Sequence, residues 1–225
     1  MKVQAIIAAG GTGQRMGGPL PKPLLLLEGV PLVLRTLRVF DAHPPIDSII
    51  LVVHAEHLAD YRRVVMEGGL RKEVAIVPGG ATRTGSVRMA LRQLDKDTDI
   101  VIVHDAVRPF VTARMLDEGI ELALKEKAAV AGVPVKPTLK VVNPATGLVM
   151  ETLDRSLVWE IQTPQVFDRQ LLERAYQGDV DATDDAGLVE QAGHVVKVYR
   201  GDYSNIKITT PGDMDIAAVF LKGKS

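Results

Sequence analysis

Short runs of apolar, largely β-branched residues recur along the chain and predict the strands of a sheet. They cover residues 3–9, 49–53, 74–77, 100–103 and 129–135. Hydrophobicity is nearly continuous within each run and does not alternate with polar residues. This pattern is typical of strands that are buried on both faces of a mostly parallel sheet.

The segments between these runs carry apolar residues three and four positions apart, the spacing that places them on one face of a helix. We expect helices within residues 31–43, 57–69, 88–97 and 114–127. Because strands and helices alternate, the pattern predicts an α/β fold with a Rossmann-like, mostly parallel sheet and helices on both faces. Ligands in such folds bind beyond the carboxyl ends of the strands, so the residues after each apolar run are the first candidates for chemistry.

One segment departs from this alternation and predicts a projecting β-hairpin arm at about residues 134–155. Two extended stretches flank the sequence Asn-Pro-Ala-Thr-Gly at 143–147, which contains the residues that turns favour. A hairpin of this size is too small to fold alone. We therefore expect a single domain over residues 1–225, with the arm packing against a second copy in a homodimer.

Composition narrows the class of protein further. The chain has 225 residues, 46% of them hydrophobic, and a formal net charge of −1. This near-neutral charge argues against binding to nucleic acid or to a membrane surface, which favours a basic excess. The sequence contains no cysteine, which excludes disulfides, thiolate metal ligands and cysteine nucleophiles. No apolar run approaches the ~20 residues of a membrane-spanning helix and no signal-peptide cleavage pattern occurs, so we expect a soluble, cytoplasmic protein.

The first apolar run leads into a glycine-rich loop, residues 10–18, which holds five glycines and one arginine, Arg15. Glycines let backbone N–H groups approach an anion closely, which favours a phosphate-binding loop. The spacing is one residue longer than the dinucleotide-binding pattern, and Pro19 and Pro21 interrupt the helix that this pattern requires. No Walker P-loop sequence occurs either. Arg15 and Lys22 place two cations beside a loop that suits phosphates.

Polar residues also follow the third apolar run. Residues 79–86 combine two glycines with Arg83 and Ser86 at a predicted helix start. Either Thr82 or Thr84 would serve as the N-cap of this helix. Capping explains the threonines but does not explain an arginine, Arg83, so close to the positive end of a helix.

Asp105 follows the fourth apolar run, at an edge where a carboxylate commonly holds Mg²⁺. The alternative is that Asp105 stabilises its loop and pairs with Arg108. We expect His104 to be a structural histidine rather than a metal ligand. Later in the chain, Lys207 lies in an apparent strand and either extends into solvent or points at an anion. Residues 210–213 fit a helix N-terminus and are expected to be structural.

Seven motifs, taken together and in order, resemble the 2-C-methyl-D-erythritol 4-phosphate cytidylyltransferase family. They are AAGGTGQRMG, PK, GGATRTGSV, VHDAVRPF, TLDRSLVWEIQTPQVF, TDDAGLVEQAG and NIKITTPGDM, and they span nearly the whole chain. The resemblance implies a nucleotidyltransferase fold and a direct transfer, in which the 4-phosphate of the acceptor attacks the α-phosphorus of CTP and releases pyrophosphate. It also implies Mg²⁺ or another divalent cation as cofactor.

The resemblance assigns roles to individual residues. Arg15 and Lys22 would stabilise the crowded α-phosphate in the transition state, and Asp105 would bind the metal ion. Arg155, at the foot of the arm, would reach the acceptor in the neighbouring subunit, while Thr183 also fits a helix cap. The implied residues are Arg15, Lys22, Arg155 and Lys207 for catalysis; Ala8, Ala9, Gly10, Gly11, Thr12, Gly13, Gly80, Ala81, Arg83, Ser86, Asp105, Ala106 and Thr163 for the nucleotide; and Arg108, Thr138, Arg155, Thr183 and Lys207 for the acceptor.

Three other functions compete with this one. A ribitol 5-phosphate cytidylyltransferase shares the fold and much of the loop chemistry, but residues 152–167 and the arm around them favour the methylerythritol acceptor. An NAD-dependent oxidoreductase is disfavoured by the spacing of the glycines. A non-catalytic nucleotide-binding module would not need to retain two transition-state cations together with Asp105.

Overall fold

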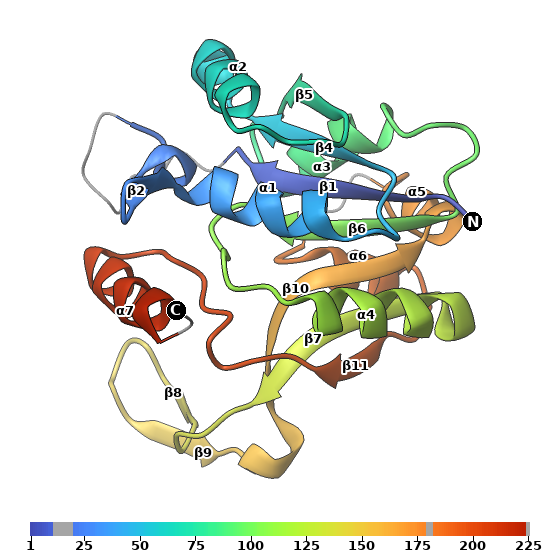
Figure 1. Ribbon diagram of the computed structural model, residues 1–225. Coiled ribbons are helices and arrows are strands. Elements are labelled where there is room, and N and C mark those ends of the chain that lie inside the picture. The colour runs from blue at the N-terminus through green and yellow to red at the C-terminus, as the bar shows by residue number, and fades with distance from the viewer. Residues whose placement is uncertain (11–19, 179–181, 224–225) are drawn as a thin grey trace.

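The apolar runs form the strands of one sheet in the computed structural model, which describes residues 1–10, 20–178 and 182–223 (Figure 1). Within those residues the sheet has seven strands. In the order in which they lie side by side, they are β11 (Lys197–Arg200), β7 (Ala128–Pro134), β10 (Trp159–Asp168), β6 (Ile100–Asp105), β1 (Val3–Ala9), β4 (Ser48–Val53) and β5 (Val74–Pro78).

The sheet is mostly parallel, as predicted. Strand β1 pairs in parallel with β4 and β6, β4 with β5, and β11 with β7. Strand β10 runs antiparallel to both of its neighbours, β6 and β7. The hydrophobic pattern did not predict β10, because its buried residues include Gln162, Thr163 and Gln165 and a proline interrupts it.

Both faces of the sheet are covered by helices, also as predicted. Alternate residues of β1 pack into different cores, Ala5 and Ile7 on one face and Ile6 on the other. One face is covered by α1 (Leu32–Ala42), α2 (Leu58–Glu67) and α4 (Ala113–Glu126). The other face is covered by α3 (Arg83–Leu91), α5 (Arg169–Ala175) and α6 (Asp185–Gln191). This double burial explains why the strand sequences are continuously apolar.

The helix predicted within residues 88–97 needs correction, because α3 begins at Arg83 and ends at Leu91. The side chain of Thr82 accepts a hydrogen bond from the Gly85 N–H at 2.9 Å, so Thr82 is the N-cap and Thr84 is not. The start of this helix therefore lies next to the loop after β5, which is where ligands bind in such sheets.

A third apolar cluster lies outside these two faces. It packs α7 (Pro211–Lys222) against Leu27, Leu32, Val107 and Phe110. The carboxylate of Asp213 accepts the N–H of Thr210 at 2.8 Å, which confirms that residues 210–213 form a structural helix start. Other short elements are η2 (Lys22–Leu24), β2 (Leu26–Leu27), β3 (Val30–Pro31) and η3 (Ala55–His57).

The predicted hairpin arm is present and projects away from the sheet (Figure 1). Strands β8 (Lys140–Val142) and β9 (Val149–Thr152) pair antiparallel, and η4 (Arg155–Leu157) follows them. In the turn, the Asn143 side chain accepts the N–H of Ala145 at 2.9 Å, and Gly147 has a φ of +72°. Glycine adopts this left-handed conformation without the steric cost that a side chain adds.

Among the helices of the described segments, none has the length and apolar character that crossing a membrane requires.

Candidate active site at the carboxyl edge of the sheet

Strand β1, which leads into the glycine-rich loop, ends beside strand β6, which ends in Asp105. Ala8 of β1 lies opposite Asp105, the last residue of β6, and the N–H of Ala106 donates to the Ala8 carbonyl at 3.0 Å. The carboxyl end of β1 therefore lies beside Asp105, at the same edge of the sheet. Of the residues predicted to bind nucleotide or to catalyse, Gly11, Thr12, Gly13 and Arg15 lie outside the described residues.

Asp105 is surrounded by three cationic side chains that come from different parts of the chain. Lys207 Nζ lies 2.9 Å and Arg108 Nε 3.5 Å from Asp105 Oδ2, and Arg83 Nε lies 3.7 Å from Oδ1. Burial raises the pKa of the Asp105 carboxyl, but Lys207, Arg83 and Arg108 outweigh it and hold that pKa well below its usual range. Asp105 is therefore an ionised carboxylate in a cationic cluster.

Lys207 reaches this cluster from a segment that is not the predicted strand. The prediction that it lies in a strand is wrong, because residues 205–209 belong to neither a strand nor a helix. The neighbouring Ile208 N–H donates to the carbonyl of Val107 at 3.0 Å, which fixes the segment against the loop after β6. Of the two roles weighed for Lys207, pointing at an anion is the one that the structure supports, and the anion is Asp105.

Arg108 is held firmly in place. Its side chain is buried, and Nη1 donates to the carbonyl of Asn205 at 2.8 Å while Nε faces Asp105. The sequence-based alternative that Asp105 pairs with Arg108 is thus confirmed. This pairing does not exclude a functional role, because the same carboxylate also contacts Arg83 and Lys207.

The loop before α3 is closed by a serine. Ser86 Oγ accepts the N–H of Gly80 at 3.2 Å and donates to the carbonyl of Thr82 at 2.9 Å. A Cβ at Gly80 would lie 2.9 Å from the backbone carbon of Gly85, so only glycine fits there without displacing the loop. The predicted nucleotide residues Gly80 and Ser86 are therefore in contact, while Ala81 is exposed beside them.

Behind Asp105 lies a layer of buried hydrogen bonds. The Thr163 hydroxyl accepts the N–H of Asp105 at 3.1 Å and bonds to His104 Nδ1 at 3.0 Å. His104 Nε2 lies 3.1 Å from the Arg108 carbonyl, an arrangement in which Nε2 donates and Nδ1 accepts. Burial lowers the pKa of His104 to about 4, so the ring is neutral. His104 is structural, as predicted, and Thr163 supports the position of Asp105.

The predicted acceptor residues are more scattered. Thr138 and Arg155 are exposed at the foot of the arm, where Arg155 Nη1 donates to the carbonyl of Lys136 at 3.0 Å. Thr183 is exposed just before α6, and the prediction that it caps this helix is wrong. Asp184 is the N-cap and accepts the N–H of Gly187 at 2.9 Å. Lys22 lies at the start of η2, which follows the glycine-rich loop in the sequence.

Residues that the sequence analysis missed connect Arg83 to the core. Arg83 Nη2 lies 2.7 Å from Asp185 Oδ2, and Asp185 Oδ1 accepts a short hydrogen bond from the Tyr176 hydroxyl. The motif TDDA contains the signal, two adjacent aspartates, but the family resemblance points to Thr183 alone. Nothing in local sequence links either aspartate to an arginine so far away in the chain.

The donor set at Asp105 fits a divalent cation that is held partly by substrate. No group of three or more histidine, aspartate or glutamate side chains suited to a metal occurs in residues 1–10, 20–178 and 182–223. Mg²⁺ in nucleotide sites is commonly bound by one or two carboxylates, with phosphate oxygens and water completing the coordination. The single carboxylate of Asp105 matches that arrangement, and a site built from protein ligands alone does not.

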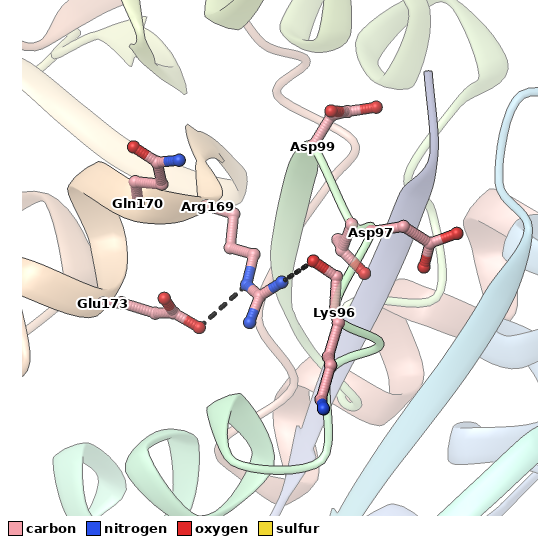
Figure 2. Close-up of a pocket in the computed structure, with 7 residues that line it drawn as sticks. Lys96, Asp97, Asp99, Arg169, Gln170 and Glu173 are labelled. Carbon is pink, nitrogen blue, oxygen red and sulfur yellow. Dashed lines mark hydrogen bonds and ion pairs between the residues drawn. The ribbon is translucent and has the colours of Figure 1, made fainter.

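A separate hollow of about 330 Å³ lies at the opposite, amino end of β6 (Figure 2). Its main cation, Arg169, donates to the carbonyl of Lys96 at 2.7 Å and to Glu173 at 2.8 Å. The guanidinium is thus used to tie the loop before β6 to α5. None of the predicted site residues that the structure describes lines this hollow.

The chain matches known proteins over its whole described length. The family model for 2-C-methyl-D-erythritol 4-phosphate cytidylyltransferase matches residues 3–223. A curated protein of that name from Alkaliphilus metalliredigens is 43% identical over 225 residues, which cover 98% of this chain and 93% of the relative. Another from Bacillus velezensis is 40% identical over 230 residues, which cover 100% of this chain and 98% of the relative.

Solved structures agree with these sequence matches. The crystal structure of 4-diphosphocytidyl-2C-methyl-D-erythritol synthase from Anaerococcus prevotii matches with a TM-score of 0.87 and 32% identity, covering 98% of this chain and 96% of that one. The 2-C-methyl-D-erythritol 4-phosphate cytidylyltransferase from Thermus thermophilus matches with a TM-score of 0.78 and 28% identity, covering 99% and 100%. This chain therefore belongs to the 2-C-methyl-D-erythritol 4-phosphate cytidylyltransferase family.

Proposed function

We propose that this chain transfers CMP from CTP to 2-C-methyl-D-erythritol 4-phosphate, in the non-mevalonate route to isoprenoid precursors. The products are 4-diphosphocytidyl-2-C-methyl-D-erythritol and pyrophosphate. Beyond family membership, the observation that carries this proposal is the cluster of Arg83, Arg108 and Lys207 around Asp105, next to the end of β1. A cationic cluster at the carboxyl edge of the sheet suits a triphosphate and a phosphate acceptor.

The chemistry is a direct displacement at phosphorus. An oxygen of the acceptor phosphate forms a bond to the α-phosphorus of CTP, the bond from that phosphorus to the bridging oxygen breaks, and pyrophosphate leaves with the electron pair. Two anions that repel each other must be aligned, and charge on the equatorial oxygens must be stabilised. Cations and backbone N–H groups perform both tasks, so no protein nucleophile is required.

The nucleotide side of the site is assigned to the two loops and the cations beside them. We assign Ala8 to Gly13 to the triphosphate, and Arg15 and Lys22 to the α-phosphate in the transition state. Gly80, Ala81 and Ser86 are assigned to the cytosine, where buried polar groups reject uracil when a donor or acceptor is left unpaired. Thr163 acts by holding Asp105.

Asp105 is the residue proposed to hold Mg²⁺ or another divalent cation. When bound, such an ion would screen the negative charge of the phosphate oxygens. Lys207 and Arg108 already contact Asp105 and would lie between the nucleotide and the acceptor. The Lys207 side chain is 43% exposed, whereas that of Arg108 is buried and hydrogen-bonded, so Lys207 can turn toward a phosphate while Arg108 stays in place.

The arm is proposed to complete the acceptor site across a homodimer. Arg155 and Thr138 lie exposed at its foot, where Arg155 donates to the carbonyl of Lys136. We propose that they serve the neighbouring subunit, with Thr183 contributing to the same acceptor pocket. A single domain over residues 1–225 and a cytoplasmic location are part of the proposal, and neither nucleic acid nor a membrane is expected as a partner.

An acceptor assay tests the proposal. Pyrophosphate release from CTP is measured with 2-C-methyl-D-erythritol 4-phosphate and, separately, with ribitol 5-phosphate, and the first acceptor is repeated with UTP and ATP. We expect turnover with CTP and the methylerythritol acceptor. Turnover with ribitol 5-phosphate alone would overturn the choice of acceptor. Stabilisation by NADH but not by CTP in a thermal shift assay would favour an oxidoreductase instead.

A further inference from the structure

Arg83 is shared between two carboxylates, and the two contacts are unequal. Arg83 Nη2 lies 2.7 Å from Asp185 Oδ2, whereas Arg83 Nε lies 3.7 Å from Asp105 Oδ1. The shorter distance is that of a charge-assisted hydrogen bond, and the longer one is an ion pair without such a bond. The orientation of the guanidinium is therefore set by Asp185, which no role in the proposed reaction includes.

Asp185 is itself fixed from several directions. Its side chain is 0% exposed, and the hydroxyl of Tyr176, at the end of α5, donates to Oδ1. The backbone N–H of Asp185 donates to Gln165 Oε1 at 3.1 Å, and that of Ala186 donates to the same oxygen at 3.0 Å. These contacts fix the Asp185 carboxylate in place. The hydrogen bond to it therefore fixes the position of the Arg83 guanidinium.

We propose that Asp185 is a positioning residue that holds Arg83 away from close pairing with Asp105. Asp185 neutralises the charge of Arg83, so Arg83 attracts the Asp105 carboxylate less strongly. The Asp105 carboxylate therefore stays available to a metal-bound nucleotide. The inference rests on the proposed function, since Asp105 is assigned there to the divalent cation. Without the charge of Asp185, Asp105 becomes the only carboxylate contacting Arg83 among the described residues, and Arg83 competes with the metal ion for it.

The test compares CTP binding to the full chain by calorimetry, at several Mg²⁺ concentrations, in wild type and variants. We expect Asp185→Asn to weaken CTP binding about tenfold or more at low Mg²⁺, the scale of a charge-assisted hydrogen bond. High Mg²⁺ should restore much of the affinity, because the competition for Asp105 follows mass action. In turnover, KM for CTP should rise while kcat changes less.

A second variant keeps the proposal testable if Asp185→Asn does not fold. Tyr176→Phe leaves the Asp185 charge in place but removes the hydroxyl that orients it, so we expect a smaller change in the same direction. Asp41→Asn is the matched control. Asp41 is also buried, accepts the N–H groups of Arg71 and Lys72 at 2.7 Å each, and lies away from the site. It should lower stability without changing CTP affinity.

The results separate this inference from the proposed function. CTP affinity that stays at the wild-type value in folded Asp185→Asn, or in Tyr176→Phe when the first variant is unfolded, overturns the positioning role. So does a loss of affinity that Mg²⁺ does not restore. A wild-type chain that binds CTP but releases no pyrophosphate with the methylerythritol acceptor overturns the proposed function, while the calorimetric comparison still decides the role of Asp185.

Discussion

At the scale of single residues, the site depends on one carboxylate whose neighbours keep it charged. Asp105 is buried at the end of β6, and its pKa is low because Lys207, Arg83 and Arg108 outweigh the cost of burial. A lone aspartate after a strand is a common feature, and sequence could not distinguish a metal ligand from a loop residue. The three cations distinguish the site from an ordinary loop, since they favour the binding of a negatively charged ligand.

The neutral histidine beneath Asp105 predicts how stability depends on pH. The pKa of His104 is lowered from 6.5 to about 4, so the unfolded chain takes up a proton first as the pH falls. Stability from this group is complete above about pH 6.5 and is lost as the pH falls toward 4. The loss between pH 7 and pH 5 is about 2 kcal/mol in the free energy of unfolding.

Urea unfolding at the two pH values measures this loss, and His104→Gln removes the titrating ring. We expect the variant to be less stable at pH 7 but to lose clearly less stability between pH 7 and pH 5. His43 is also buried with a lowered pKa, so it supplies part of the dependence that remains. An unchanged dependence in His104→Gln would contradict the assignment of this pH effect to His104.

At the scale of elements, the loop between β5 and α3 is shaped by close backbone contacts. Ser86 closes the loop onto Gly80, and Thr82 caps the helix that follows. The sequence predicted a helix start here from its threonines and glycines. The apolar periodicity, however, placed the helix within residues 88–97, because that periodicity continues beyond Leu91, where α3 ends.

Gly80→Ala tests whether this loop conformation serves the nucleotide. Its new Cβ would lie 2.9 Å from the backbone of Gly85, so the loop must shift, at a cost of about 1–3 kcal/mol. We expect CTP affinity measured by calorimetry to fall by about 5- to 150-fold.

Gly212→Ala is the control for this substitution. A Cβ at Gly212, in the first turn of α7, has its nearest neighbour at 4.0 Å. The control should leave CTP binding unchanged. Equal affinity of Gly80→Ala and wild type would show that the nucleotide does not depend on this loop.

At the scale of the whole molecule, the arm exposes apolar surface that a single copy does not cover. Its exposed apolar side chains are Val141, Val142, Leu148, Val149, Met150 and Leu157. Exposed apolar side chains gathered on one arm are typical of an interaction site, and two strands alone gain little stability from pairing. Both observations support the proposed homodimer.

Met150→Lys tests the dimer by placing a charge on the arm. We expect the dimer dissociation constant, measured by sedimentation equilibrium, to rise about tenfold or more, because a buried unpaired charge is costly. Met66→Lys is a matched control, since Met66 on α2 is 79% exposed and Met150 is 69% exposed. A wild-type chain that stays monomeric, or a Met150→Lys chain that dimerises like wild type, would contradict the arm's role.

What could be predicted from sequence follows from the range of each interaction. Five strands were predicted because burial on both faces makes each strand's own residues continuously apolar; they are β1, β4, β5, β6 and β7. The arm was predicted from its turn residues, which act within a few positions. Strand β10 was missed because its buried polar residues are satisfied by distant partners, such as the Asp105 N–H that Thr163 accepts.

By itself, the sequence determined the fold class, the positions of most strands, the hairpin and the family. These depend on local apolar patterns and on motifs that keep their order along the chain. Only the tertiary structure decided that Lys207 reaches Asp105 from a segment outside the sheet, and that Asp185 orients Arg83. Those contacts join residues 102 positions apart, and they exist because the order of strands brings their loops to one edge. The residues next to each partner in the sequence do not indicate such pairs.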